Sequence, residues 1–265
     1  FAALTTGDNN TAVGFDSLKA NTTGTFDASL GACSLLSNTT GAENTGIGGQ
    51  ALKCNTTGSQ NTALGYASVF TNTTGSSNTG VGCGALFANT TGGQNTALGM
   101  NSLDANTTGA SNTAVGFSAL GANTTGGSNL AVGVCALPAN TTGAGNVSIG
   151  CGTLLVNTTG TFNTALGFRA MCSNTTVAGN TGLGACALKK NTTGGGNTAV
   201  GYQSLQLNTT GANNTAMGCD SLPTNTTGAG NTAIAHKALK SNTTGGDNVA
   251  VGLLALEDCT TGNNN

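Results

Sequence analysis

The sequence predicts an all-β chain, a β-solenoid (parallel β-helix or β-roll) with one 17-residue repeat per coil and about 15 coils. One motif recurs every 17 residues from end to end, without an insertion or deletion. That period is too short for a helical pair, which needs roughly 34 residues, or for a propeller blade of roughly 40. β-branched residues, Gly and Asn also return at fixed positions, as in a short strand bounded by tight turns. Residues 1–265 are therefore predicted to form a single continuous solenoid.

We number the positions of a coil as columns, starting at the Asn of Asn-Thr-Thr-Gly. The consensus is N-T-T-G-x-x-N-T-A-[VLI]-G-x-x-[AS]-L-x-x. Column 4 is Gly except at Val177, column 7 is Asn except at Asp27, and column 11 is Gly except at Ala235. Because Gly and Asn tolerate positive φ, these columns are predicted to form the turns. Gly116 in column 11 is expected to adopt a conformation or a close approach that a side chain disfavours.

Two short strands are predicted in each coil. Columns 8 to 10 read Thr-Ala-aliphatic, and column 15 is Leu apart from the variants Val69 and Met171. Columns 10 and 15 are expected to point inward and form the core. Residues 17 apart would stack about 4.8 Å from one another, which makes a rod on the order of 70 Å long. Columns 9 and 14 hold only small residues, which suggests a second face that another chain covers.

Composition excludes several classes of partner. Charged residues are 6% of the chain and the net charge is −2, so there is no basic patch for nucleic acid or anionic lipid. No apolar run approaches the roughly 20 residues that cross a bilayer, so no membrane insertion is expected. The charges fall in columns 5, 6, 13, 16 and 17, which are predicted to face water, and Asp27 is the single exception. The chain enters and leaves in the middle of a repeat, which predicts uncapped ends.

The Asn-Thr-Thr corner matches the acceptor pattern for N-glycosylation in fourteen coils. The other interpretation is a ladder of Asn and Thr side chains that are hydrogen-bonded between coils, and the sequence leaves both open. Glycans about 4.8 Å apart would crowd severely, which argues against full occupancy. The candidate glycosylation residues are Asn21, Asn38, Asn55, Asn72, Asn89, Asn106, Asn123, Asn140, Asn157, Asn174, Asn191, Asn208, Asn225 and Asn242.

Cysteine and histidine give little support for a metal site, a cofactor or catalysis, and none of the three is predicted. The nine Cys lack C-x-x-C spacing, and no two share a column in neighbouring coils. Nine acidic residues are too few for a calcium-binding β-roll. Cys83, Cys151 and Cys219 in column 12 are expected to act as small buried hydrophobes. Cys219 would stack on His236, and a ladder of filler side chains is favoured there over a catalytic Cys-His pair.

The run N-T-A-V-G-x-x-[AS]-L occurs at 10–18, 112–120 and 197–205. It resembles the repeats in the head domains of trimeric autotransporter adhesins. It is also similar to the N-T-A-V-G-Y-x-A-L/N-T-T-G arrays of tail-fibre-like proteins. The resemblance implies a β-roll or β-helix, often trimeric, at the surface of a cell or particle.

These observations favour a non-enzymatic structural subunit or segment of an extracellular or cell-surface fibre, with the Asn-Thr-Thr stripe as a candidate glycan acceptor. The expected partners are copies of the chain, joined head to tail, laterally or as a trimer. One alternative is an ice-binding (antifreeze) β-solenoid that uses the Thr ladder. Adjacent Thr residues in a strand point to opposite faces, however, whereas ice-binding solenoids space them as T-x-T. The other alternative is a surface or tail-fibre adhesin, which would need loop insertions or an aromatic patch.

Overall fold

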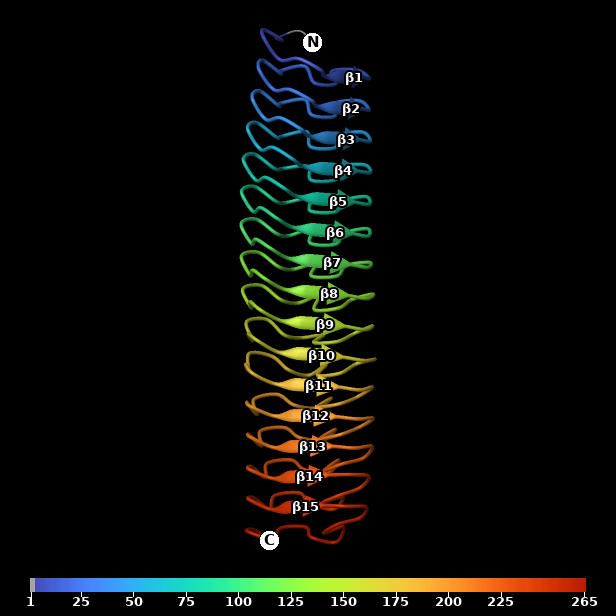
Figure 1. The fold of residues 1–265 in the computed structure, drawn as a ribbon, viewed down its shortest axis with the longest axis vertical. Coiled ribbons are helices and arrows are strands. Elements are labelled where there is room, and N and C mark those ends of the chain that lie inside the picture. The colour runs from blue at the N-terminus through green and yellow to red at the C-terminus, as the bar shows by residue number, and fades with distance from the viewer. Residues whose placement is uncertain (1–2) are drawn as a thin grey trace. The chain divides into compact units, whose positions relative to one another are not determined.

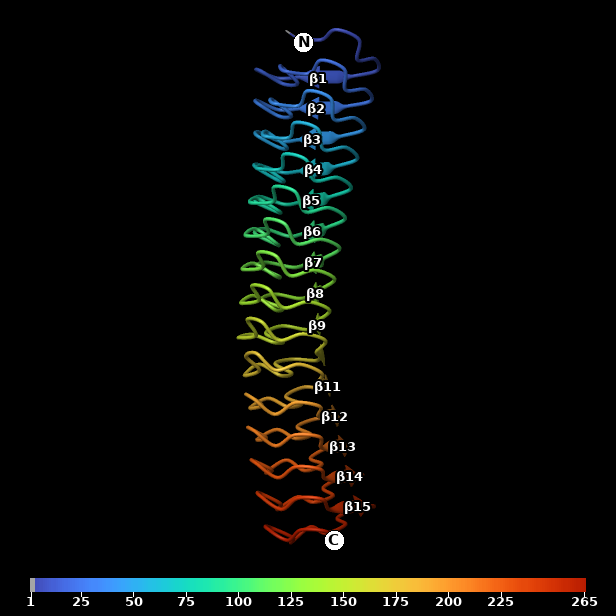
Figure 2. The same ribbon diagram turned by 90° about the vertical axis from the view of Figure 1, so that its left-hand side faces the viewer.

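The structure is a computed structural model that describes residues 3–265, in two compact units. The first unit extends to Asn129, and the second is Leu130–Asn265. Phe1 and Ala2, where the sequence enters a repeat, lie outside the described residues. Each unit is a stack of coils, with one short strand in each coil (Figures 1 and 2).

Every strand covers columns 8 to 10 and is three residues long. The first unit holds β1 (Thr11–Val13), β2 (Ala28–Leu30), β3 (Thr45–Ile47), β4 (Thr62–Leu64), β5 (Thr79–Val81), β6 (Thr96–Leu98) and β7 (Thr113–Val115). The second unit holds β8 (Leu130–Val132), β9 (Val147–Ile149), β10 (Thr164–Leu166), β11 (Thr181–Leu183), β12 (Thr198–Val200), β13 (Thr215–Met217), β14 (Thr232–Ile234) and β15 (Val249–Val251).

Within each unit, consecutive strands pair in parallel, with residues 17 apart as partners. Thr96 of β6 lies opposite Thr113 of β7, and Thr198 of β12 lies opposite Thr215 of β13. Each unit is therefore a β-solenoid with one 17-residue repeat per coil, and the predicted fold class is confirmed.

The second predicted strand is absent from the described residues, so that prediction was wrong. Column 15 lies in a turn, and its Leu residues have positive φ, for example 51° at Leu103. Column 13 is also left-handed, as at Asn101 with φ of 54°. These turns bring the chain back across the coil in a few residues. Left-handed backbone is strained for Leu, and the side chain of Leu103 is fully buried in return.

The core differs from the prediction in one column. Column 15 points inward as expected, and Leu103 is 0% exposed. Column 10 points outward instead: Leu98 is 46% exposed, whereas its neighbour Ala97 in column 9 is 0% exposed. Since successive side chains of a strand alternate between faces, burial of column 9 turns columns 8 and 10 to the surface.

The small residues of columns 9 and 14 pack against each other inside the coil. Ser34 Oγ in column 14 donates to the Gly46 carbonyl in column 9 at 2.9 Å. A Cβ added at Gly46 would lie 2.6 Å from that same Oγ. The opposite wall of the coil therefore covers these columns, and the expectation that another chain covers them was wrong.

Column 11 behaves as predicted. Gly116 has φ of 130°, and a Cβ at Gly99 would lie 2.6 Å from the Gly116 carbonyl oxygen. Ala235, the exception, takes φ of 103°. Column 4 needs Gly for space rather than for φ, because a Cβ at Gly92 would overlap the carbonyl of Gly109.

Val177 occupies the one column 4 position without Gly, and the backbone ladder is altered in its coil. The amide of Thr158 donates to the Thr175 carbonyl at 2.8 Å, and the amide of Thr192 donates to the Thr209 carbonyl at 3.0 Å. Among the residues described, the amide of Thr175 makes no such bond. The extra side chain therefore weakens contact between two coils of the second unit.

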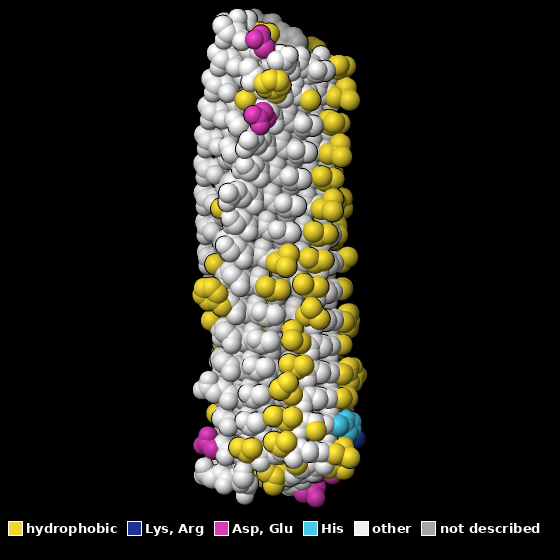
Figure 3. Space-filling view, viewed as in Figure 1, with side chains coloured by type: hydrophobic (Ala, Val, Ile, Leu, Met, Phe, Trp, Pro, Cys, Tyr) yellow, Lys and Arg dark blue, Asp and Glu magenta, His cyan; other side chains and the backbone are white. Residues whose placement is uncertain are grey.

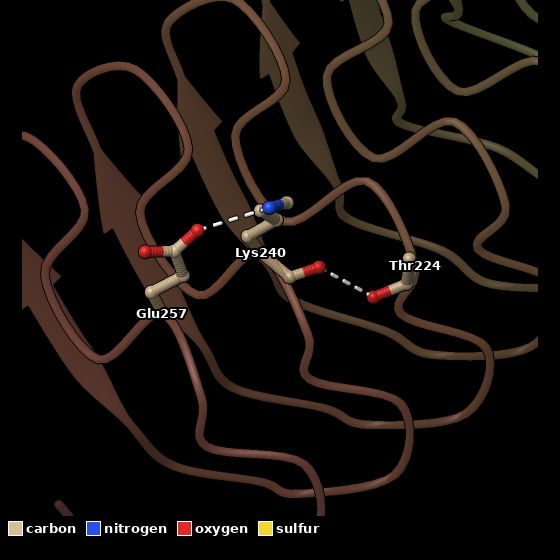
Figure 4. A network of polar contacts seen from close by, with 3 residues as sticks. All are labelled: Thr224, Lys240 and Glu257. Carbon is tan, nitrogen blue, oxygen red and sulfur yellow. Dashed lines mark hydrogen bonds and ion pairs between the residues drawn. The ribbon is translucent and has the colours of Figure 1, made fainter.

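Charged side chains also stack at the 17-residue interval. Lys240 Nζ lies 2.9 Å from Glu257 Oε1 in the next coil, and Thr224 Oγ1 donates to the Lys240 carbonyl at 2.6 Å (Figure 4). The hydrogen bond from Lys240 to Glu257 raises the pKa of the ammonium. Residues 3–265 contain no helix with the length and hydrophobicity of a membrane span.

Candidate functional site

The Asn-Thr-Thr corner has a buried and an exposed part. All fourteen candidate Asn side chains are 0% exposed. The amide nitrogen of Asn55 shows the pattern: it donates to Asn38 Oδ1 of the preceding coil at 2.8 Å and to the Gly58 carbonyl of its own coil at 2.8 Å. The corner is thus a hydrogen-bonded ladder, one of the two interpretations that the sequence left open.

This geometry argues against glycans on these Asn residues in the folded chain. A glycan would be attached at Nδ2, and at Asn55 that atom is enclosed and already donates twice. Attachment would have to precede folding, and the modified coil could not then close around the substituted nitrogen.

The two Thr columns of the corner differ in exposure. Thr73 Oγ1 in column 2 donates to the Thr90 carbonyl of the next coil at 3.0 Å, and this side chain is half-buried. Thr74 in column 3 is exposed. The corner therefore presents a single column of exposed Thr, and these Thr residues lie in a bend rather than in a strand.

Asn in column 7 forms a second buried ladder. Asn61 Nδ2 donates to Asn44 Oδ1 at 3.1 Å and to the Gly75 carbonyl at 2.9 Å, while its backbone amide also donates to Asn44 Oδ1 at 3.1 Å. Column 7 is structural, but the expectation of positive φ there was wrong, because the left-handed residue is the one before it in column 6, for example Gln60 with φ of 61°. Asp27 replaces Asn at one rung, and its side chain is 1% exposed.

The outward face of the strands carries no charged residue, and it combines Thr hydroxyls with many apolar side chains. Column 8 supplies Thr in most coils, column 10 supplies an aliphatic side chain, and column 12 lies beyond the strand on the exposed surface. We call columns 8, 10 and 12 the outer face. In the first unit its most exposed hydrophobic residues are Val13, Phe15, Leu30, Leu64, Tyr66, Leu98, Met100 and Phe117. In the second unit they are Val134, Leu166, Phe168, Tyr202, Met217, Val249, Val251 and Leu253.

In Figure 3, hydrophobic side chains run along the face on which Figure 1 draws the strands, and few charged side chains are visible beside them. Exposure is large for such residues, at 76% for Phe15 and 58% for Tyr66. Sequence reasoning missed this surface because it placed column 10 in the core. The alternation Thr-Ala-Val in columns 8 to 10, together with the small residues of column 14, indicates that column 9 faces inward and column 10 faces outward.

The cysteines are all unpaired, as free thiols. Cys83, Cys151 and Cys219 are exposed, so their predicted role as small buried hydrophobes was wrong. The reason is the same as for column 10: column 12 belongs to the outer face. Cys172 is the buried thiol, and its Sγ lies 3.5 Å from the Lys189 carbonyl.

Cys219 and His236 share a column in adjacent coils, yet no hydrogen bond joins their side chains in the described part of the chain. Cys219 Sγ instead lies 3.7 Å from Asp220 Oδ2. Partial desolvation and the Asp220 carboxylate raise the pKa of the Cys219 thiol. A nucleophilic cysteine needs the opposite shift, so this arrangement supports the filler interpretation.

Over residues 3–265 the structure shows no pocket and no cluster of three or more potential metal ligands. No protein-family model matches the chain. A comparison with curated proteins also finds no match.

Proposed function

We propose that this chain is a structural rather than catalytic segment of an extracellular fibre, and that copies associate side by side through the outer face. The exposed apolar outer face is the observation that carries the proposal. Isolated exposed hydrophobic residues are ordinary, whereas contiguous apolar patches of several hundred Å² mark interaction surfaces.

The composition of the outer face supports a second copy as the partner. Columns 8, 10 and 12 contain no Asp, Glu, Lys or Arg in any coil. Two such faces can therefore pack together without burying an unpaired charge, and burial of their Leu, Phe and Tyr side chains stabilises the contact. A second copy has the same spacing between coils, so its side chains would meet those of the first copy at the same position in every coil. The resemblance of the repeat to adhesin heads and tail-fibre arrays supports a place outside the cell.

The test compares matched double variants in the same two coils. Leu64→Lys with Leu98→Lys places charge on the outer face, while Thr57→Lys with Thr91→Lys places the same charge on the exposed column 3. We expect the wild type and the Thr variant to associate in analytical ultracentrifugation, and the Leu variant to remain monomeric. Circular dichroism melting would verify that all three are folded. A monomeric wild type across the concentration series would refute the proposal.

One observation favours ice binding as a second candidate. The strands turn Thr of column 8 and an aliphatic side chain of column 10 to the same surface, so β6 presents Thr96 and Leu98 outward. This places uncharged hydroxyl and methyl groups at the coil spacing of about 4.8 Å. An assay of ice recrystallisation inhibition tests it, with Thr96→Lys as the disabling variant and Thr91→Lys as the control. Absence of inhibition by the wild type would reject this candidate.

A further inference from the structure

The column 7 ladder has a regular bonding pattern against which one residue stands out. At an ordinary rung, Nδ2 donates both to the Asn of the preceding coil and to a column 4 carbonyl. The Gly58 carbonyl accordingly receives two amide donors, Asn44 Nδ2 at 3.0 Å and Asn55 Nδ2 at 2.8 Å.

Asp27 removes the donor from its rung. Its Oδ1 accepts from Asn44 N at 2.9 Å and from Asn44 Nδ2 at 3.1 Å, and its Oδ2 accepts from Asn38 Nδ2 at 3.0 Å. Among the described residues, the Gly41 carbonyl receives a single side-chain donor, Asn38 Nδ2 at 2.9 Å. Asn10 Oδ1 likewise receives only the Asp27 backbone amide, at 2.8 Å.

Within residues 3–265, no charged side chain compensates Asp27. The charged groups of its own coil and of the coils packed on either side are exposed or half-buried, and none of them is bonded to its carboxyl. They are Asp8, Asp16, Lys19, Glu43 and Lys53. An ionised Asp27 is thus a buried charge whose only hydrogen-bond partners are neutral amides. It also occupies a column in which the other coils have an Asn side chain that donates.

We propose that Asp27 is a pH-responsive break in the column 7 ladder of the first unit, where protonation of the carboxyl tightens the adjoining coils and ionisation loosens them. A protonated carboxyl has one O–H donor, so it restores a donor at the rung that lacks one. When that proton is lost to solvent, the carboxylate oxygens have no hydrogen to donate, and the Gly41 carbonyl and Asn10 Oδ1 remain without the donor that an Asn would supply.

The pKa of the Asp27 carboxyl is shifted in the direction that the proposal requires. Burial raises the pKa of Asp27 from 3.8 to about 6, against the lowering effect of the hydrogen bonds from Asn44 and Asn38. Because the folded pKa lies above the unfolded value, the stabilising contribution is complete below pH 3.8 and is lost as the pH rises through about 6. Above that pH the loss is constant.

Hydrogen exchange read by mass spectrometry tests the proposal on the whole chain, from pH 4 to pH 8 with correction for intrinsic exchange rates. Coils around Asp27 are compared with the coil of Thr79 in the same unit, because residues 72–88 include no Asp, Glu, Lys, Arg or His. The variants are Asp27→Asn, which completes the ladder, and Asp8→Asn, which removes an exposed carboxylate. In the wild type we expect the opening constant around Asp27 to rise by up to about 100-fold over this range, since each pKa unit corresponds to tenfold.

The same rise is expected in Asp8→Asn, whereas in Asp27→Asn the opening constant should not change with pH, and in the Thr79 coil it should not change with pH in any variant. A wild-type response that persists in Asp27→Asn would overturn the assignment. A carboxyl pKa for Asp27 below 4, measured by carbon NMR, would also overturn it.

Discussion

A negative charge at Ala97 should unfold the first unit, whereas the same charge one residue later, at Leu98, should be tolerated. Both residues lie in β6, and if column 10 pointed inward Leu98 would be the core residue and Ala97 would lie on the opposite face. The structure separates them, with Ala97 at 0% exposed and Leu98 at 46%.

The magnitudes follow from that difference. Ala97→Asp places a carboxylate in the closed interior with no counter-charge, which costs about 3–5 kcal/mol. Leu98→Asp forfeits only the buried half of a Leu side chain. Full burial is worth about 1.5–3 kcal/mol, so the loss is about 1 kcal/mol. The expected gap between two neighbouring substitutions is therefore several kcal/mol.

Urea denaturation followed by circular dichroism measures both variants, at dilutions where the wild type is monomeric so that association does not contribute. Hydrogen exchange over β5 to β7 then locates the effect, because coils of a solenoid can open separately. Equal destabilisation by the two substitutions would refute the assignment of faces, as would an unchanged midpoint for Ala97→Asp. Leu98→Ala controls for loss of the side chain without added charge.

Three other predictions follow from particular residues. Val177→Gly should stabilise the second unit by about 1 kcal/mol, the worth of one restored backbone hydrogen bond, and a lowered melting temperature would contradict this. A purified N-glycosyltransferase of relaxed sequence preference should leave Asn106 unmodified in the folded protein and modify it after unfolding, as intact-mass measurement would show. With iodoacetamide, exposed Cys83 should react in the native state and buried Cys172 only after denaturation; equal rates would contradict the burial.

The period, the column 11 turn and the burial of the Leu column could be predicted from sequence because each depends on one property of one residue type. Gly116 tolerates φ of 130°, and Leu103 is large and apolar. The orientation of the strand could not be predicted in that way. Hydrophobicity favours Leu98 over Ala97 for the core, but the narrow space between the walls of a 17-residue coil selects the smaller side chain. The small residues of column 9 therefore reflect the thickness of the interior and not a second interface.

The Asn-Thr-Thr corner and the outer face were harder to predict from sequence than the fold. Asn55 followed by two Thr residues reads equally well as a glycan acceptor and as a ladder rung, and only burial of its nitrogen distinguishes them. The outer face depended on the orientation of column 10, so an error in the core concealed it. Asp27, by contrast, stood out in the sequence as the one charge outside the surface columns, although its bonding partners could not be inferred.

The two Asn ladders also have a direction. In each, the side-chain amide of a later coil donates to the earlier one, as Asn72 does to Asn55 and Asn78 to Asn61. Backbone bonds between coils run both ways, since Thr96 donates forward to Asn112 while Gly99 donates back to Val81. More backbone amides donate forward than back, as Thr56, Thr62 and Val69 do forward and Gln60 and Gly65 do back, so the bonds between Asn side chains run against the majority direction of the backbone bonds. Each added coil therefore extends a chain of side-chain hydrogen bonds that all point the same way, and such bonds polarise and strengthen one another.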